Sequence, residues 1–91
     1  MAYRVTFVPA AAKQLRKLAK NTQARLIATI SDLADDPRPN GSKKLAGSEG
    51  FIRVRVGDYR VVYTVDDDVK VLEVVVVRIG HRKEVYRFLN D

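Results

Sequence analysis

The chain has 91 residues and a formal net charge of +6, and 46% of its residues are hydrophobic. This length allows one core, so we expect a single domain over residues 1–91. The sequence has no cysteine and one histidine, which excludes disulfide scaffolds, thiol nucleophiles, zinc ribbons and His-rich metal sites. The longest strongly apolar run, Val74–Val77, is too short to span a bilayer, and the first residues lack a signal-peptide pattern. We therefore expect a cytoplasmic protein.

The basic charge is unevenly distributed along the chain. Residues 1–65 carry 12 basic and 5 acidic side chains, whereas residues 66–91 carry 5 and 6. A local basic excess in so small a protein suggests an anionic partner, with nucleic acid as the leading candidate. A surface that serves only solubility is the alternative, and composition alone favours neither.

The first residues predict a strand and then an amphipathic helix. Tyr3–Val8 alternates and ends at Pro9, which suits the first turn of a helix. Over residues 10–20 the apolar side chains recur at helical spacing on one face. The opposite face carries Lys13, Arg16, Lys17 and Lys20. Such a stripe is typical of the solvated side of a helix, and it also suits the steering of RNA.

A second helix and a loop follow. Asn21 or Thr22 is expected to cap this helix, and Asp36-Pro37 to end it, because the residue before proline disfavours helical angles. The two helices predict an αα-hairpin with one shared buried side. Residues 37–50 carry turn formers without periodicity, which predicts a loop. Lys43 and Lys44 in this loop either are solvated or contact RNA.

The next segment predicts a β-hairpin with a basic face. Gly57-Asp58 fits a two-residue turn between strands at Phe51–Val56 and Tyr59–Val65. That register places Val56 opposite Tyr59, Arg55 opposite Arg60, and Arg53 opposite Val62. Like charges directly across a strand pair are destabilising. The arginines therefore predict either a phosphate site, which the planar guanidinium suits, or a solvated face where long side chains splay apart.

The last segment predicts a strand and a short helix. Val69–Ile79 is rich in β-branched residues, as is typical of a central strand covered on both sides, and Gly80 is expected to break it. Arg82–Leu89 then suits a short final helix. The fold class predicted is α+β: an N-terminal strand, an αα-hairpin, a mainly antiparallel sheet and a short C-terminal helix.

Two side chains near the end of the chain are further candidates. Tyr86 lies beside the apolar side of the final helix, where a partly exposed ring can stack on a base. His81 follows a glycine at the end of a strand, although a lone histidine is more often structural.

Three segments in this order resemble the RelE branch of the RelE/ParE toxin superfamily: KKLAG (43–47), GDYRVVYTVDDD (57–68) and RIGHRKEVYR (78–87). The similarity spans essentially the whole chain. The resemblance implies a RelE-like fold and the toxin of a type II toxin–antitoxin pair. It implies an endoribonuclease that cuts mRNA in the ribosomal A site by metal-free 2′-OH attack, without a cofactor. The implied partners are a RelB-like antitoxin, the ribosome and mRNA.

The resemblance also implies roles for individual residues. Arg60 would stabilise the phosphorane, and Arg53 and Arg55 would take the basic strand positions. Arg82 would take the position of the basic residue after the glycine, and Tyr86 would stack on a base. Lysines commonly stand where this chain has Arg53 and Arg55, and arginine is a poor general base because it stays protonated at neutral pH. His81 is the side chain naturally suited to proton transfer at neutral pH, which makes it a further catalytic candidate.

Three other functions remain open at this point. A ParE-like protein has the same fold, but it inhibits gyrase and has no nuclease site. A non-catalytic RNA- or ribosome-binding module would keep the basic face without needing Arg60 or Tyr86. A toxin-like fold that has lost toxicity is the third.

Overall fold

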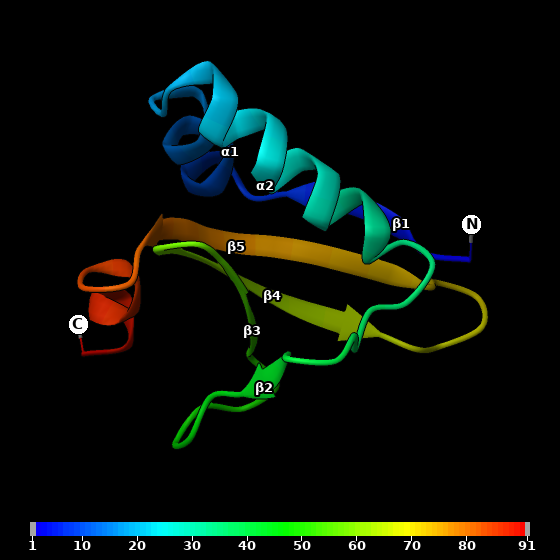
Figure 1. Cartoon of the computed structure of the whole chain (residues 1–91). Helices are drawn as coiled ribbons and strands as arrows, with labels where there is room; N and C mark the ends of the chain where they lie inside the picture. The colour runs from blue at the N-terminus through cyan, green and yellow to red at the C-terminus, as the bar shows by residue number, and fades with distance from the viewer. Residues whose placement is uncertain (1, 91) are drawn as a thin grey trace.

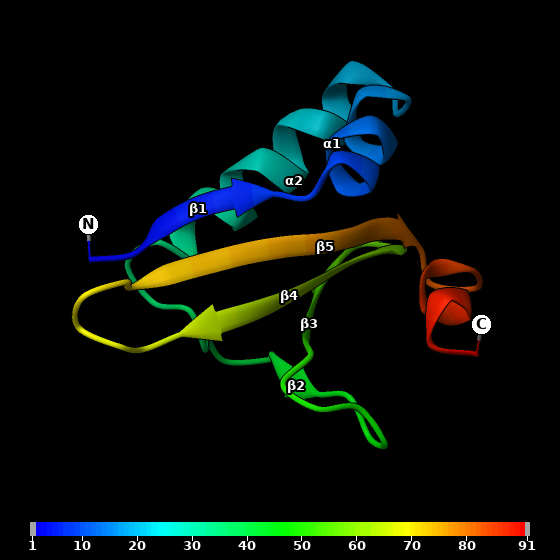
Figure 2. The ribbon, with the colours of Figure 1, turned by 180° about the vertical axis from the view of Figure 1, so that it is seen from behind.

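The computed structural model of the chain describes residues 2–90 and combines two α-helices with a five-stranded sheet. The elements are β1 (Arg4–Phe7), α1 (Pro9–Arg16), α2 (Lys20–Asp32), β2 (Lys43–Lys44), β3 (Ile52–Val56), β4 (Tyr59–Asp66), β5 (Glu73–His81) and the 3-10 helix η1 (Val85–Asn90). The strand order is β1-β5-β4-β3-β2; β1 runs parallel to β5, and the other neighbours are antiparallel. Figures 1 and 2 show α1 and α2 together over one side of the sheet and η1 beyond the end of β5. The predicted α+β class is confirmed.

The turn between the two helices differs from the prediction. α1 ends at Arg16, so Lys20 opens α2 rather than continuing α1. The amide of Gln23 closes this turn, because its Nε2 donates to the carbonyl of Leu18 over 2.7 Å. A single four-residue basic stripe on one helix is therefore wrong: it is divided between two helices. The cause is the tight turn that an αα-hairpin requires.

The ends of α2 also differ from the prediction. The N-cap residue is Ala19, which makes no side-chain cap, so the expected caps at Asn21 and Thr22 are wrong. The carboxamide of Asn21 instead accepts from the backbone N–H of Thr22. The helix ends at Asp32, before the Asp36-Pro37 step, and a series of turns leads the chain to β2.

The predicted hairpin is confirmed in its register. Val56 pairs with Tyr59, Arg55 with Arg60, and Arg53 with Val62. Gly57 has φ +61°, which suits the first central position of a type II′ hairpin turn, where glycine is favoured.

The last strand is displaced toward the C-terminus relative to the prediction, and it contains a β-bulge. β5 begins at Glu73 and not at Val69, and it passes through Gly80 to His81, so the expected start and the expected break at Gly80 are both wrong. Tyr63 pairs with Val76, whereas its neighbour Val62 pairs with Arg78, which leaves Val77 as the extra residue. One extra residue reverses the side of the sheet to which all later side chains point.

The core lies between the helices and the sheet. It is formed mainly by apolar side chains of α2, β3, β4 and β5, and includes Leu26, Ile30, Val54, Val61, Tyr63, Val74, Val76 and Ile79. Tyr63 is fully buried, and its hydroxyl donates to the carbonyl of Pro37 over 2.7 Å. Burial raises the pKa of the Tyr63 phenol, so this hydroxyl stays protonated at neutral pH.

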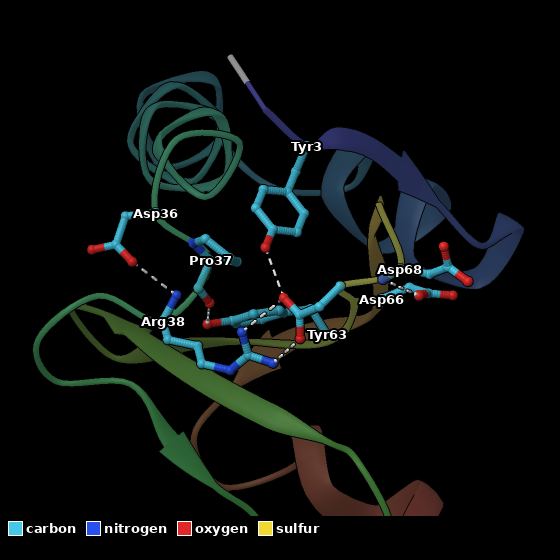
Figure 3. Close-up of polar contacts among 8 residues, drawn as sticks. Tyr3, Asp36, Pro37, Arg38, Tyr63, Asp66 and Asp68 are labelled. Atoms are coloured by element: carbon cyan, nitrogen blue, oxygen red, sulfur yellow. Dashed lines mark hydrogen bonds and ion pairs between the residues drawn. The ribbon is translucent and has the colours of Figure 1, made fainter. Parts of the chain in front are cut away.

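A cluster of polar side chains lies at the β4–β5 turn (Figure 3), which is at the end of the sheet opposite to η1 (Figure 1). The Arg38 guanidinium donates two hydrogen bonds to the Asp67 carboxylate, with an Nη2–Oδ2 distance of 2.8 Å and an Nη1–Oδ1 distance of 3.2 Å. The Tyr3 hydroxyl donates to Asp67 Oδ1 over 2.7 Å. The cluster therefore ties the segment before β1 and the loop after α2 to the β4–β5 turn. No helix in the described part of the chain is long and apolar enough to cross a membrane.

Candidate functional site

The sheet surface turned away from α1 and α2 carries basic side chains in two rows. The first row crosses four strands through Lys43, Arg53, Val62 and Arg78. The second row consists of Arg55, Arg60 and Gly80. Residues paired across strands share a side of the sheet, and neighbouring strands lie about 4.8 Å apart. We call the five cations the basic face: Lys43, Arg53, Arg55, Arg60 and Arg78.

The centre of the basic face is a buried apolar residue, although charged side chains surround it. Val62 is fully buried, yet it lies outside the core beneath the helices. Its partners on either side, Arg53 and Arg78, are half-buried. Long arginine stems cover apolar surface while their guanidinium groups reach the solvent.

No ion pair of residues 2–90 neutralises the basic face. Within residues 2–90, the ion pairs of arginine join Arg4, Arg38 and Arg82 to acidic residues, and none involves the basic face. The guanidinium of Arg53 donates to the Gly41 carbonyl, and that of Arg60 donates to the carbonyls of Gly57 and Tyr59. These neutral acceptors orient the side chains without cancelling their charge. The basic face is thus organised to receive an anion.

The start of η1 packs against the basic face. Val85 is buried, and its Cβ lies 3.5 Å from the position that a Cβ on Gly80 would occupy. Because Gly80 is in the row of Arg60, this contact places the start of η1 next to that row. Tyr86, the next residue, is half-buried. The structure therefore brings the predicted stacking residue close to the predicted phosphate site.

A cleft of about 550 Å³ separates η1 and the end of β5 from α1. Lys17, Arg78, His81, Arg87 and Phe88 are among its lining residues. Arg78 of the basic face and Lys17, which follows α1, both line this cleft, so it lies between the basic face and the end of α1.

His81 and Arg82 lie at the end of β5 and make different contacts. His81 pairs with Tyr59, so it shares the helix-covered side of the sheet, opposite to that of Arg60. Its ring stands edge-on to the Tyr59 ring at 5.9 Å, and its Nδ1 accepts from the backbone N–H of Lys83. Arg82 is exposed, with its Nε 3.7 Å from Asp58 Oδ1 at the hairpin turn. The structure therefore does not bring His81 onto the face that holds Arg60.

The other predicted RNA-binding residues are exposed but dispersed. Lys13 and Arg16 lie on α1 and Lys17 directly follows it, whereas Lys20 begins α2. Lys43 belongs to the basic face, but its neighbour Lys44 pairs with Ile52 and so points to the other side of the sheet. Lys43 and Lys44 thus form a short strand within the segment predicted as a loop, so that prediction is wrong at these two positions, and the strand pairing selects Lys43.

Arg78 was not predicted from the sequence as a site residue. Simple alternation along β5 would place it on the same side as the buried Val74 and Val76. The bulge at Val77 instead turns Arg78 to the basic face and Ile79 into the core. The one signal in the sequence is its charge, because an arginine rarely points into an apolar core.

The described part of the chain contains no group of three or more His, Cys, Asp or Glu side chains placed to hold a metal ion. The charged groups that the basic face offers to a bound molecule are its five cations.

Comparison with known proteins places the chain in a family. A family model described as "ParE toxin of type II toxin-antitoxin system, parDE" matches residues 5–86. The chain belongs to the RelE/ParE toxin superfamily. This RelE-type toxin is 32% identical over 88 residues to the toxin RelG of Mycobacterium tuberculosis, covering 96% of this chain and 99% of RelG. It is also 32% identical over 87 residues to the mRNA interferase toxin RelE of Escherichia coli K12, covering 94% of this chain and 92% of that protein.

Solved structures of RelE proteins share the fold of this toxin. The RelE–RelB complex of Pyrococcus horikoshii matches with a TM-score of 0.76 and 29% identity, over 93% of this chain and 100% of that one. The toxin–antitoxin complex RelBE2 of M. tuberculosis matches with a TM-score of 0.77 and 31% identity, over 90% and 100%. Like these proteins, the toxin is a component of a toxin–antitoxin system.

Proposed function

We propose that this toxin is a ribosome-dependent endoribonuclease that cleaves mRNA in the A site without a metal ion. The observation that carries the proposal is the basic face, in which two rows of cations lie across the sheet without an ion pair to any described carboxylate. Relatives that are named mRNA interferases support the same reaction class.

The reaction needs an anion site of this kind. The 2′-oxygen of one nucleotide attacks the adjacent phosphorus, and the bond from phosphorus to the 5′-oxygen of the next nucleotide breaks. The 2′-hydroxyl loses a proton, the leaving oxygen gains one, and the products are a 2′,3′-cyclic phosphate and a 5′-hydroxyl. Negative charge grows on the phosphorane oxygens, and preoriented cations stabilise it more than they stabilise the ground state.

The arrangement of side chains suggests how the work is divided. We assign the phosphorane to Arg60, which lies between Arg55 and the open position at Gly80. Arg53 and Arg55 bind the non-bridging oxygens and the neighbouring phosphate. Arg82, at the hairpin turn, extends the same anion site.

Proton transfer is the part of the reaction that the basic face does not itself supply. Arginines stay protonated at neutral pH and so act as charge donors rather than as bases. The imidazole of His81 accepts at Nδ1, which leaves Nε2 to carry its proton when the ring is neutral. His81 and Arg60 lie on opposite sides of the sheet. We therefore assign proton transfer to His81 in a binding mode in which the RNA passes around the end of β5 and contacts both sides.

RNA binding extends beyond the reacting phosphate. Tyr86 is proposed to stack on a base beside the scissile bond. Six surface cations are proposed to contact ribosomal or messenger phosphates: Lys13, Arg16, Lys17, Lys20, Lys43 and Lys44. Their contribution is electrostatic and should weaken as the salt concentration rises.

We also propose a RelB-like antitoxin as the partner that neutralises the toxin. Several of the matching structures, including those from P. horikoshii and E. coli, are RelE–RelB complexes. The net charge of +6 favours an acidic antitoxin, and the exposed Phe7 and Ile27 offer apolar surface to an amphipathic segment.

The direct test is to add the purified protein to ribosomes programmed with a defined mRNA and to map the mRNA ends by primer extension. We expect cuts within the codon in the A site and none in free mRNA. Ribosome binding without cuts would overturn the nuclease assignment in favour of a non-catalytic binding module.

Inhibition of gyrase is the second candidate function, because the matching family model is named for ParE. The same protein preparation is therefore incubated with gyrase and plasmid DNA. Trapped gyrase–DNA complexes together with intact mRNA would assign the protein to the ParE branch.

A further inference from the structure

We propose that Arg78 holds η1, and with it Tyr86, against the basic face; this inference rests on the proposed function. Arg78 is then a positioning residue for the contact that Tyr86 makes with RNA. The Cζ atom of the Arg78 guanidinium lies 4.7 Å from the centre of the Phe88 ring. A guanidinium within about 6 Å of an aromatic ring, over its face, is attracted by the ring quadrupole.

The anchored helix is weak by itself. η1 spans Val85–Asn90 as a 3-10 helix, and 3-10 runs longer than about four residues are uncommon because their hydrogen bonds are poorly aligned. Its position must therefore come from tertiary contacts. These contacts include the packing of Val85 on Gly80 and two contacts of Phe88.

Phe88 forms the second anchor of η1. Its ring meets the Phe51 ring edge-on, with centroids 5.5 Å apart and an interplanar angle of 76°. Arg78 lies over the same ring. Tyr86 stands between Val85 and Phe88 in the sequence, so the two anchors together position the backbone that carries its ring.

Arg78 is itself held in place for this contact. The bulge at Val77 turns Arg78 onto the basic face, and the Arg78 Nη1 donates to the Val77 carbonyl over 2.6 Å. The side chain is half-buried and has no ion pair among the described residues. No carboxylate among residues 2–90 pairs with the guanidinium in place of the Phe88 ring.

The first test measures the position of Tyr86 without ribosomes. The four tyrosines are labelled as 3-fluorotyrosine, and their fluorine resonances are assigned by single Tyr→Phe substitutions. In Arg78→Gln and Phe88→Leu, we expect the Tyr86 resonance to move while those of Tyr3, Tyr59 and Tyr63 stay. Amide exchange of residues 85–89 should become about fivefold to thirtyfold faster. Lys70→Gln removes the same charge in the β4–β5 turn and should change neither quantity.

The second test asks whether Arg78 acts through Tyr86. Single-turnover mRNA cleavage on ribosomes is compared for Arg78→Gln, Tyr86→Ala and the double variant. We expect Arg78→Gln to slow cleavage about fivefold to thirtyfold alone and to have no further effect when Tyr86 is already alanine. Arg78→Lys should restore part of the rate, because an ammonium can also lie over the ring.

The two tests distinguish a failure of the proposed function from a failure of the proposed role of Arg78. A protein that cuts no mRNA overturns the proposed function, whereas the fluorine and exchange measurements still report whether Arg78 holds η1. An unchanged Tyr86 resonance with unchanged exchange in both variants overturns the proposal. A full effect of Arg78→Gln in the Tyr86→Ala background also overturns it, because Arg78 would then contact RNA directly.

Discussion

Gly80 of β5 lies directly opposite Arg60 of β4, and it is the one residue of that row without a side chain. Val85 packs against Gly80, so the start of η1 lies close to the row of Arg60. A Cβ at position 80 would just reach van der Waals contact with Val85, so side chains larger than that of alanine would have to displace the start of η1. The Arg60–Gly80 pair therefore links the proposed phosphate site to the helix that carries Tyr86.

Replacing Arg60 should abolish cleavage while the fold remains. Arg60→Ala removes the charge nearest the proposed phosphorane, and loss of a preoriented donor costs roughly a hundredfold or more in rate. It also removes two hydrogen bonds to turn carbonyls, a loss of about 0.5–1.5 kcal/mol each that relief of repulsion with Arg55 partly offsets. Single-turnover cleavage on ribosomes and thermal melts of the same preparation provide the measurement.

The matched control is Lys70→Ala, an exposed lysine in the β4–β5 turn, which should cut at the wild-type rate. Wild-type cleavage by Arg60→Ala, or a loss of activity that merely follows unfolding, would contradict the role of the basic face.

Replacing Tyr86 should slow cleavage less severely. Stacking of a base on an aromatic ring contributes about 1–3 kcal/mol, so Tyr86→Ala should reduce the single-turnover rate about fivefold to one-hundred-fold. Tyr86→Phe keeps the ring and should retain most of the activity. Equal losses in the two variants would mean that the hydroxyl, and not stacking, is required.

Ribosome binding should depend on salt and on the cations near the cleft. Reversal of the exposed Arg16 and Lys17 to glutamate should weaken binding and reduce the slope of log affinity against log salt concentration. Binding is measured by sedimentation with 70S ribosomes over a range of salt concentrations, with circular dichroism to check the fold. An affinity that does not change with salt would contradict any function that relies on phosphate contacts.

The cluster of Tyr3, Arg38 and Asp67 should stabilise the fold without contributing to activity. Hydrogen bonds from Arg38 and then Tyr3 hold the pKa of Asp67 below its usual value, so its contribution is present above that usual pKa. This contribution is lost as the pH falls through the lowered pKa of the folded protein. Asp67→Asn should therefore melt at a lower temperature than the wild type at pH 7, with a difference that shrinks under strongly acidic conditions. A difference that persists at low pH would rule out the ionised carboxylate as the cause.

Expression of the toxin alone should arrest growth, because an uninhibited nuclease stops translation in its host. Co-expression of its cognate antitoxin should restore growth, and Arg60→Ala should be tolerated without it. The measurement is a growth curve after induction, with the amount of folded protein checked in each strain. Healthy growth at high levels of folded wild-type protein would contradict the toxic function.

The fold class, the family and the hairpin register can be predicted from the sequence alone. Alternation in β3 is strict, and the Gly57-Asp58 turn fixes which residues face one another, so Arg55 and Arg60 could be paired correctly. Both determinants are local: the pleat has a period of two, and glycine takes the positive φ at the turn. The helix boundaries were less accurate, because the Gln23 side chain that closes the α1–α2 turn acts across several residues.

The composition of the basic face depends on long-range strand pairing. The run of β-branched residues in β5 contains no signal for the bulge at Val77, which arises from pairing with β4. That single extra residue reverses the alternation. It thereby brings Arg78 into the row of Arg53 and Val62, and it turns His81 away from the basic face. The pairing of the short β2 strand likewise selects Lys43 over Lys44. A side chain's position on a sheet depends on the register of its neighbours, and long-range pairing sets that register.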